Sequence, residues 1–170
     1  MVIAYMGKLG DRDIFEKAGV RAFSFKGMDV GSLYETMGEV DKTYKADPEQ
    51  LRDFMISNQM DGYIEIRFVS LRKEETSSES QYPTRREYRI MDDANYDKLI
   101  NEYGKREEKG AIYEDIKVKM DIRLFNRAGD RYVVVWSSRT ESSNPRNNQA
   151  IAEACTRVAK KAMKKQGILP

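Results

Sequence analysis

The sequence predicts a single α/β (α+β) domain, in which helices pack against a mixed β-sheet in the order βαβαβ, insertion, ββα. Three observations carry this prediction. A strand–turn–strand–helix unit closes the chain, strands and helices alternate in its first half, and a charged stretch separates the two halves. Strand–helix alternation favours parallel strands joined by right-handed crossovers, and tight turns favour antiparallel pairing. At 170 residues, one domain over residues 1–170 is expected.

The closing unit begins with a strand at residues 116–125, where apolar and polar side chains alternate with period two. The apolar positions are Ile116, Val118, Met120, Ile122 and Leu124, and the charged positions between them are Lys117, Lys119, Asp121 and Arg123. This period predicts a strand with the first set buried and Lys117, Lys119 and Arg123 exposed. A turn at residues 126–130, where Gly129 can take positive φ, leads to a returning strand at 132–136.

A helix is expected to close the chain. Asn144 is its predicted cap, Pro145 suits its first position, and Gly167 is its predicted stop. Its expected apolar stripe comprises Ile151, Ala154, Cys155, Val158, Ala162 and Met163. Cys155, the only cysteine, is expected to be a buried thiol, with an intermolecular disulfide as the alternative.

The first half alternates between strands and helices. Strands are predicted at residues 2–6, 29–34 and 63–71. A helix capped by Asp11 and stopped by Gly27 is expected between the first two, although Gly19 within it weakens the pattern. A second helix begins at Pro48, with Asp47 as its cap and Leu51, Phe54 and Met55 facing inward.

Residues 72–110 form a charged insertion between the core strands. Within it we predict a short strand at 85–90 and a helix at 92–103. Residues 76–81 contain no apolar side chain to bury, so we expect them to be the most mobile interior stretch.

Three stretches of the chain resemble a known family. They are residues 12–27, residues 48–64, and the closing unit with its Gly129 turn, the motif Val135-Trp136-Ser137-Ser138, Asn144-Pro145, and residues 165–169. Together they resemble small bacterial periplasmic lipoproteins of uncharacterised function whose fold is like the TolB amino-terminal domain. The family often has a Tyr- and Gly-rich insertion where this chain has a charged one, and the lipid-carrying cysteine expected at the start of the mature chain is absent.

This resemblance implies a non-enzymatic cell-envelope protein, an interaction or assembly module with a protein partner. It also implies a periplasmic location, with membrane anchoring in the full-length precursor. The sequence itself shows no signal peptide and no apolar run long enough to span a bilayer. The alternative is a cytoplasmic binding module.

No motif in the sequence predicts catalysis, a cofactor or a metal. The chain has no histidine, which removes the commonest base and metal ligand. Residues 7–10 lack the length and ending of a phosphate-binding loop, so a plain turn is the favoured interpretation. Asp92, Asp93 and Asp97 are better explained as solvated side chains than as a cation site, and residues 142–144 as helix capping rather than an anion site. Trp136 is expected to pack against the sheet.

Charge is unevenly distributed along the chain. From Pro145 onward there are six basic side chains and one acidic side chain, a net charge of +5, whereas the whole chain carries +2 and the remainder therefore −3. The predicted anionic-partner face comprises Arg157, Lys160, Lys161, Lys164 and Lys165. The alternative is that these cations compensate the helix dipole and keep the helix solvated. The small net charge gives no reason to expect nucleic-acid binding.

Overall fold

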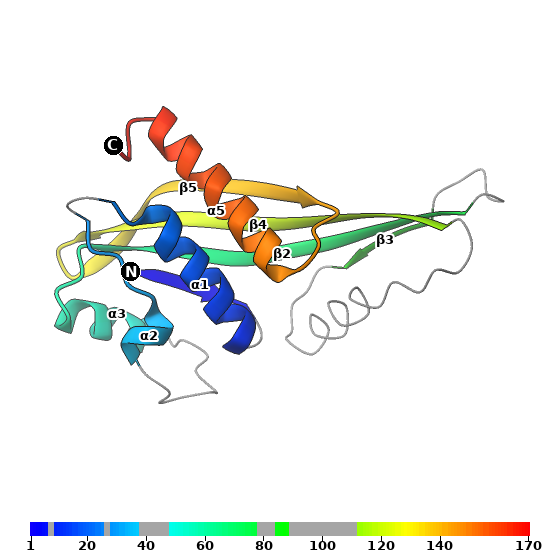
Figure 1. Ribbon diagram of the computed structural model, residues 1–170. Helices are drawn as coiled ribbons and strands as arrows, with labels where there is room; N and C mark the ends of the chain where they lie inside the picture. Colours follow the sequence, from blue (N-terminus) through cyan, green and yellow to red (C-terminus); the bar gives the residue numbers. More distant parts are fainter. Residues whose placement is uncertain (7–8, 26–27, 38–47, 78–83, 89–111) are drawn as a thin grey trace.

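The computed structural model describes residues 1–6, 9–25, 28–37, 48–77, 84–88 and 112–170, and its fold is α+β (Figure 1). One mixed sheet has the strand order β1 (Val2–Tyr5), β2 (Gly62–Ser77), β4 (Ile112–Ala128) and β5 (Arg131–Ser143). A further strand, β3 (Thr84–Tyr88), pairs with β2 off this path. β1 is parallel to β2, and the other described strand pairs are antiparallel. The predicted mixed sheet with packed helices is therefore confirmed.

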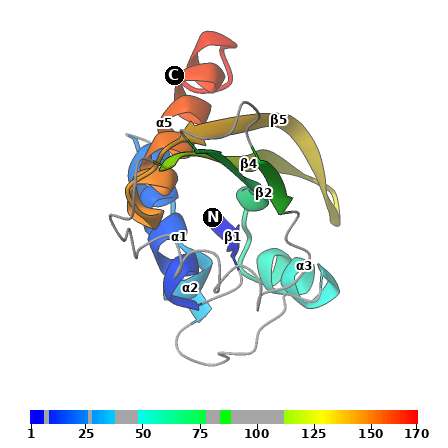
Figure 2. The ribbon, with the colours of Figure 1, turned by 90° about the vertical axis from the view of Figure 1, so that its right-hand side faces the viewer.

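Helices cover both faces of the sheet. α1 (Leu9–Phe23) and α5 (Asn148–Lys165) lie side by side on one face, here called the inner face (Figures 1 and 2). On the opposite, outer face, α3 (Pro48–Ser57) packs near β1 and forms a smaller apolar cluster. The main core fills the space between the inner face and the two long helices, and includes Val2, Phe15, Ile66, Met120, Ile122, Cys155 and Met163.

Strand β4 has the predicted period-two pattern. Ile116, Val118, Met120 and Ile122 are buried on the inner face, and Leu124 is half-buried. The expectation that the basic residues between them are exposed is wrong in degree, because Lys117, Lys119 and Arg123 are only half-exposed. Each of the three lies within ion-pair distance of a carboxylate on the same face, which keeps its side chain close to the sheet.

The prediction of a second strand at residues 29–34 is wrong. Ser32 makes an isolated parallel bridge with Val2, and the chain then enters the short helix α2 (Leu33–Met37). The Ser32 Oγ accepts a hydrogen bond from the Glu35 N–H at 3.0 Å, as a helix cap does. Capping at Ser32 therefore starts a helix where the apolar pattern favoured a strand. In the described residues, three helices connect β1 to β2.

Helix α1 confirms the first predicted helix with both ends shifted, since it ends at Phe23 and not at the predicted stop, Gly27. It begins at Leu9, so Asp11 lies inside the helix instead of capping it. Gly19 has a packing role, because a Cβ at this position would come within 2.6 Å of Val2 Cγ1. The missing side chain therefore lets α1 lie close against β1.

The second predicted helix and the long strand after it are also present. α3 begins at Pro48, with Leu51 and Met55 buried and Phe54 half-buried. Its predicted cap, Asp47, lies outside the described residues. The outer-face cluster next to it contains Tyr63, whose ring stacks on that of Phe125 at a centroid distance of 4.3 Å.

Part of the predicted insertion extends the sheet. β2 continues through Ser77, paired with β4, and β3 confirms the strand predicted near residue 85. Figure 1 shows this end of β2 and β4 reaching away from the helices. Thr76 and Ser77 therefore lie in a strand, whereas residues 78–81 of the predicted mobile stretch and the predicted helix at 92–103 lie outside the described residues.

The predicted start of the closing helix is wrong by three residues, so Pro145 precedes the helix and is not its first residue. Asn147, not Asn144, is the cap, and its side chain accepts a hydrogen bond from the Ala150 N–H at 2.9 Å. Asn144 has a φ of 47° and instead fastens the end of β5 to β4. Its side-chain oxygen accepts from the Ile116 N–H, and its side-chain nitrogen donates to Asp115.

Candidate functional site

Helix α5 is fixed to the sheet by a buried stripe on one side. The stripe comprises Ile151, Ala152, Cys155, Thr156, Ala159 and Met163. The helix ends where Gly167 takes a φ of 70° and the Ile168 N–H donates to the Met163 carbonyl at 3.0 Å. The prediction that the helix stops at Gly167 is therefore confirmed. The predicted stripe is confirmed in part, but Val158 is 50% exposed and does not belong to it.

The five predicted basic residues lie together on the side of α5 opposite the buried stripe. They are Arg157, Lys160, Lys161, Lys164 and Lys165, here called the basic face. At 3.6 residues per turn they span an arc of about 140°. Lys160 is half-buried and the other four are exposed. None of the five forms an ion pair within the part of the chain that the structure describes.

The acidic residue of the helix lies on the same side as the basic face but one turn before it, four residues ahead of Arg157. Glu153 is in the first half of α5, where its carboxylate lies 3.8 Å from Arg21 of α1 and accepts a hydrogen bond from Gln149. Lys164 and Lys165 occupy the last turn, next to the carbonyl end of the helix dipole. The charged side chains in the C-terminal half of α5 are therefore all positive.

One exposed apolar side chain borders the basic face. Val158 lies three residues before Lys161 and seven before Lys165, so it shares their side of the helix. Exposed basic side chains next to an exposed apolar one can bind an anionic surface by Coulomb attraction and by burial of the apolar group.

Cys155 is structural. Its side chain is buried in the stripe, and its Sγ donates to the Ala152 carbonyl at 3.3 Å. Burial raises the pKa of this thiol to about 12, so little of the reactive thiolate forms at neutral pH. The predicted buried thiol is confirmed.

The other sequence candidates do not form a binding site within the described residues. Leu9 and Gly10 belong to α1, and residues 7–8 of the same turn lie outside the described residues. Ser142 and Ser143 belong to β5 and not to a helix start. Asp92, Asp93 and Asp97 lie outside the described residues, within which no group of three side chains could hold a metal ion.

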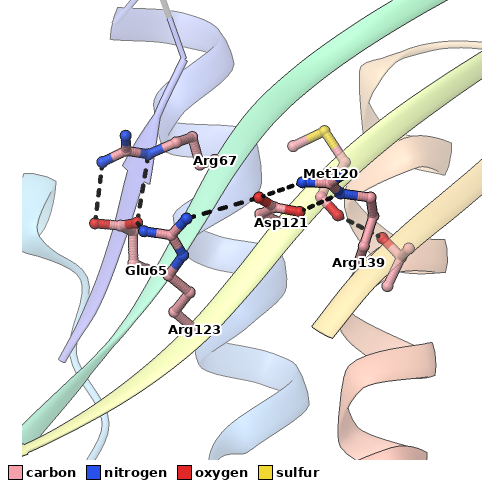
Figure 3. Close-up of polar contacts among 7 residues, drawn as sticks. Glu65, Arg67, Met120, Asp121, Arg123 and Arg139 are labelled. Carbon is pink, nitrogen blue, oxygen red and sulfur yellow. Dashed lines mark hydrogen bonds and ion pairs between the residues drawn. The ribbon is translucent and has the colours of Figure 1, made fainter. Parts of the chain in front are cut away.

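The structure also brings together a row of charged side chains on the outer face that the sequence did not predict (Figure 3). Arg67 and Arg123 lie 3.3 Å and 3.8 Å from the Glu65 carboxylate. Arg123 also lies 3.8 Å from Asp121, which accepts hydrogen bonds from Arg139 at 2.7 Å and 3.1 Å. The row crosses β2, β4 and β5.

These outer-face charges form ion pairs, with three arginines beside two carboxylates. The hydrogen bonds from Arg139 hold the pKa of Asp121 below its usual value. Because each acid has a basic neighbour on the same face, most of the charge of the row is balanced within one subunit. We therefore assign it to the stability of the sheet.

Glu16 is a second polar group that stabilises the fold. Its side chain is fully buried and accepts hydrogen bonds from the Ala4 and Tyr34 N–H groups and from Arg12 Nε, at 3.0, 2.8 and 2.7 Å. Burial raises its pKa, against the opposing effect of Arg12. Because its oxygens hold β1, α1 and the start of α2 together, Glu16 is a structural connection.

Trp136 packs as expected. It is buried, and it joins β5 to the end of α5 by a hydrogen bond to Gln166. Among the described residues, no helix is both long enough and apolar enough to cross a bilayer. Comparison of the chain with family models, curated proteins and solved structures finds no match.

Proposed function

We propose that this protein is a non-enzymatic interaction module that docks on an anionic membrane surface through the basic face of α5. The observation that supports this is the set of five cations opposite the buried stripe, without ion-pair partners among the described residues. Elsewhere in the described structure, the basic residues of the outer face have acidic neighbours. The positive charge of the basic face is therefore available to an anionic partner.

Two physical effects favour an anionic lipid surface as the partner. Each basic residue near such a surface contributes about 1 kcal/mol, and salt weakens this attraction over a Debye length of roughly 8–10 Å. Val158 adds an exposed apolar group that can be buried at the headgroup boundary. Because packing on the core already holds α5 in place, docking does not have to order the helix.

The test is binding to anionic vesicles by a variant in which Lys160, Lys161, Lys164 and Lys165 are replaced by Gln. Gln is a good helix former, so the fold should be kept. We expect the wild type to co-sediment with phosphatidylserine-containing vesicles at low salt and the variant to bind much more weakly. Neutral vesicles should bind neither protein.

A matched control removes four positive charges elsewhere, by Gln substitution of the exposed residues Arg52, Arg127, Arg131 and Arg146. If binding depends on the basic face, this control should bind almost as well as the wild type. Equal binding by the wild type and the four-lysine variant would exclude the basic face, and equal loss in both variants would mean that only net charge matters.

A second candidate concerns the cellular location and rests on the motifs that resemble those of envelope lipoproteins. We propose a periplasmic module, membrane-anchored in its full-length precursor, that assembles with an envelope protein. Gly129, Trp136 and Gly167 of those motifs lie in the β4–β5 turn, in β5 and at the end of α5. Fractionation of cells expressing the natural gene tests this candidate. Recovery from the cytoplasm would favour the cytoplasmic alternative with the same basic face.

A further inference from the structure

Strand β5 forms an edge of the sheet. It pairs with β4 on one side, and no described strand pairs with its other side. The opposite edge, β1, differs because the Val2 N–H donates to the Gly31 carbonyl at 2.8 Å beside the Ser32 bridge. An open edge strand presents free backbone donors and acceptors, to which another strand can be added.

The second half of β5 has a sequence that is complementary to itself. Residues 137–143 read Ser-Ser-Arg-Thr-Glu-Ser-Ser, which is the same in both directions except that Arg139 and Glu141 exchange places. Two such strands that pair antiparallel about Thr140 would place each arginine opposite a glutamate. Every other position would face its own residue type.

The hydrogen-bonding pattern of the sheet fits this pairing. The Asn144 N–H donates to the Ile116 carbonyl at 2.7 Å. From there the β4–β5 register runs without a shift, from Lys117 opposite Ser143 to Leu124 opposite Trp136. Because hydrogen-bonded and non-hydrogen-bonded pairs alternate in antiparallel sheets, alternate residues of β5 direct their backbone groups away from β4. These residues are Ser137, Arg139, Glu141 and Ser143.

The side chains and the neighbouring helix also leave this half of the edge accessible. Arg139 and Glu141 are both exposed on the outer face. The end of α5 is held to β5 at Trp136, beside the first half of the strand (Figure 1). The β-bulge at Leu124/Phe125 is likewise confined to the pairing with the first half of β5.

We propose that β5 pairs antiparallel with β5 of a second copy about a twofold axis at Thr140, so that the sheet continues across a homodimer. Arg139 then faces Glu141 of the partner subunit, and the reverse contact forms by symmetry. The occupant of the edge is a second copy because the segment is complementary to its own reversed sequence. This surface is separate from the basic face of α5 and does not depend on the proposed function.

The test is sedimentation velocity over a wide concentration series. The wild type should show a reversible monomer–dimer equilibrium. In a Glu141→Arg dimer, both symmetric contacts between positions 139 and 141 become arginine–arginine pairs. In an Arg139→Glu dimer, both become glutamate–glutamate pairs. Like charges opposite each other are destabilising, so each single variant should raise the dimer Kd about tenfold or more. An equimolar mixture of the two variants should form a heterodimer, because all facing charges are then opposite.

Arg131→Glu is the matched control, since it reverses a charge on β5 outside the paired segment and should leave the dimer Kd unchanged. A wild type that stays monomeric throughout the series would overturn the proposal. A dimer insensitive to Glu141→Arg, or variants that fail to associate when mixed, would overturn this pairing. Because Arg139→Glu can weaken the fold near Asp121, amide exchange of the wild type gives a second measurement. Protection of Ser137, Arg139, Glu141 and Ser143 should rise with concentration, and protection that does not change would count against the dimer.

Discussion

The Trp136 indole N–H donates a hydrogen bond to the Gln166 Oε1 at 2.7 Å, and this contact joins the sheet edge to the last turn of the basic helix. Gln166→Ala removes the acceptor, so we expect the free energy of unfolding to fall by about 1 kcal/mol. When Trp136→Phe has already removed the donor, Gln166→Ala should lower the free energy of unfolding by much less. Denaturant melts of the two single variants and the double variant measure the coupling. Additive losses would mean that the hydrogen bond does not stabilise the protein.

The fully buried position of Ile122 gives a prediction for the core. Ile122→Ala should lower the free energy of unfolding by roughly 2–5 kcal/mol, as large-to-small core changes do. The control is Val134→Ala on the exposed part of β5, where the change should be within about 0.5 kcal/mol. A loss below about 1 kcal/mol for Ile122→Ala would contradict the assignment of the inner face to the main core.

Gly19 and Val2 should behave as a coupled pair. A Cβ at position 19 would lie 2.6 Å from Val2 Cγ1, so Gly19→Ala should destabilise the fold by about 1–3 kcal/mol despite its better helix propensity. Val2→Ala makes room for that methyl group, and the double variant should be more stable than the sum of the two losses predicts. Thermal melts can measure this, with Gly31→Ala as the control because its Cβ would come no closer than 3.6 Å to Thr36 Oγ1. Strict additivity would show that α1 does not rest on β1 at this point.

Asp121 gives a prediction for pH dependence. Its folded-state pKa is held below 3.8 by the hydrogen bonds from Arg139, so its charge stabilises the folded state above that value. This stabilisation is lost as the pH falls through the lowered pKa. The difference in unfolding free energy between the wild type and Asp121→Asn should therefore be largest near neutral pH and shrink in acid. A difference that stays constant across this range would show that Arg139 does not perturb Asp121.

Local patterns in the sequence predicted most of the sheet but not every element. The alternation from Ile116 to Leu124 was enough to locate β4, because period two belongs to strands. The strand predicted at residues 29–34 failed because Ser32 and Glu35 have the spacing of a capping box, a signal that was present in the sequence. Asn144 and Asn147 are both good caps, and only the contacts of Asn144 with β4 decide between them.

The candidate site was predictable in its charge and not in its surroundings. The five cations follow from helical periodicity alone, since they recur on one side of α5. By contrast, the outer-face row requires the strand register that sets Glu65 opposite Arg123 and Asp121 opposite Arg139. The exposure of Val158 also depends on tertiary structure, because it follows from how α5 is rotated against the sheet.

The proposed function depends on which surface of the protein meets the anionic partner, and a site-specific label measures this directly. A nitroxide attached at Val158→Cys reports on the basic face, and one at Val134→Cys reports on β5. The native Cys155 should not interfere, because its buried thiol has a pKa raised to about 12. On addition of phosphatidylserine vesicles at low salt, the label at position 158 should become shielded from a water-soluble relaxation agent while that at position 134 stays accessible. A label at position 158 that remains fully accessible on vesicle-bound protein would contradict docking through the basic face.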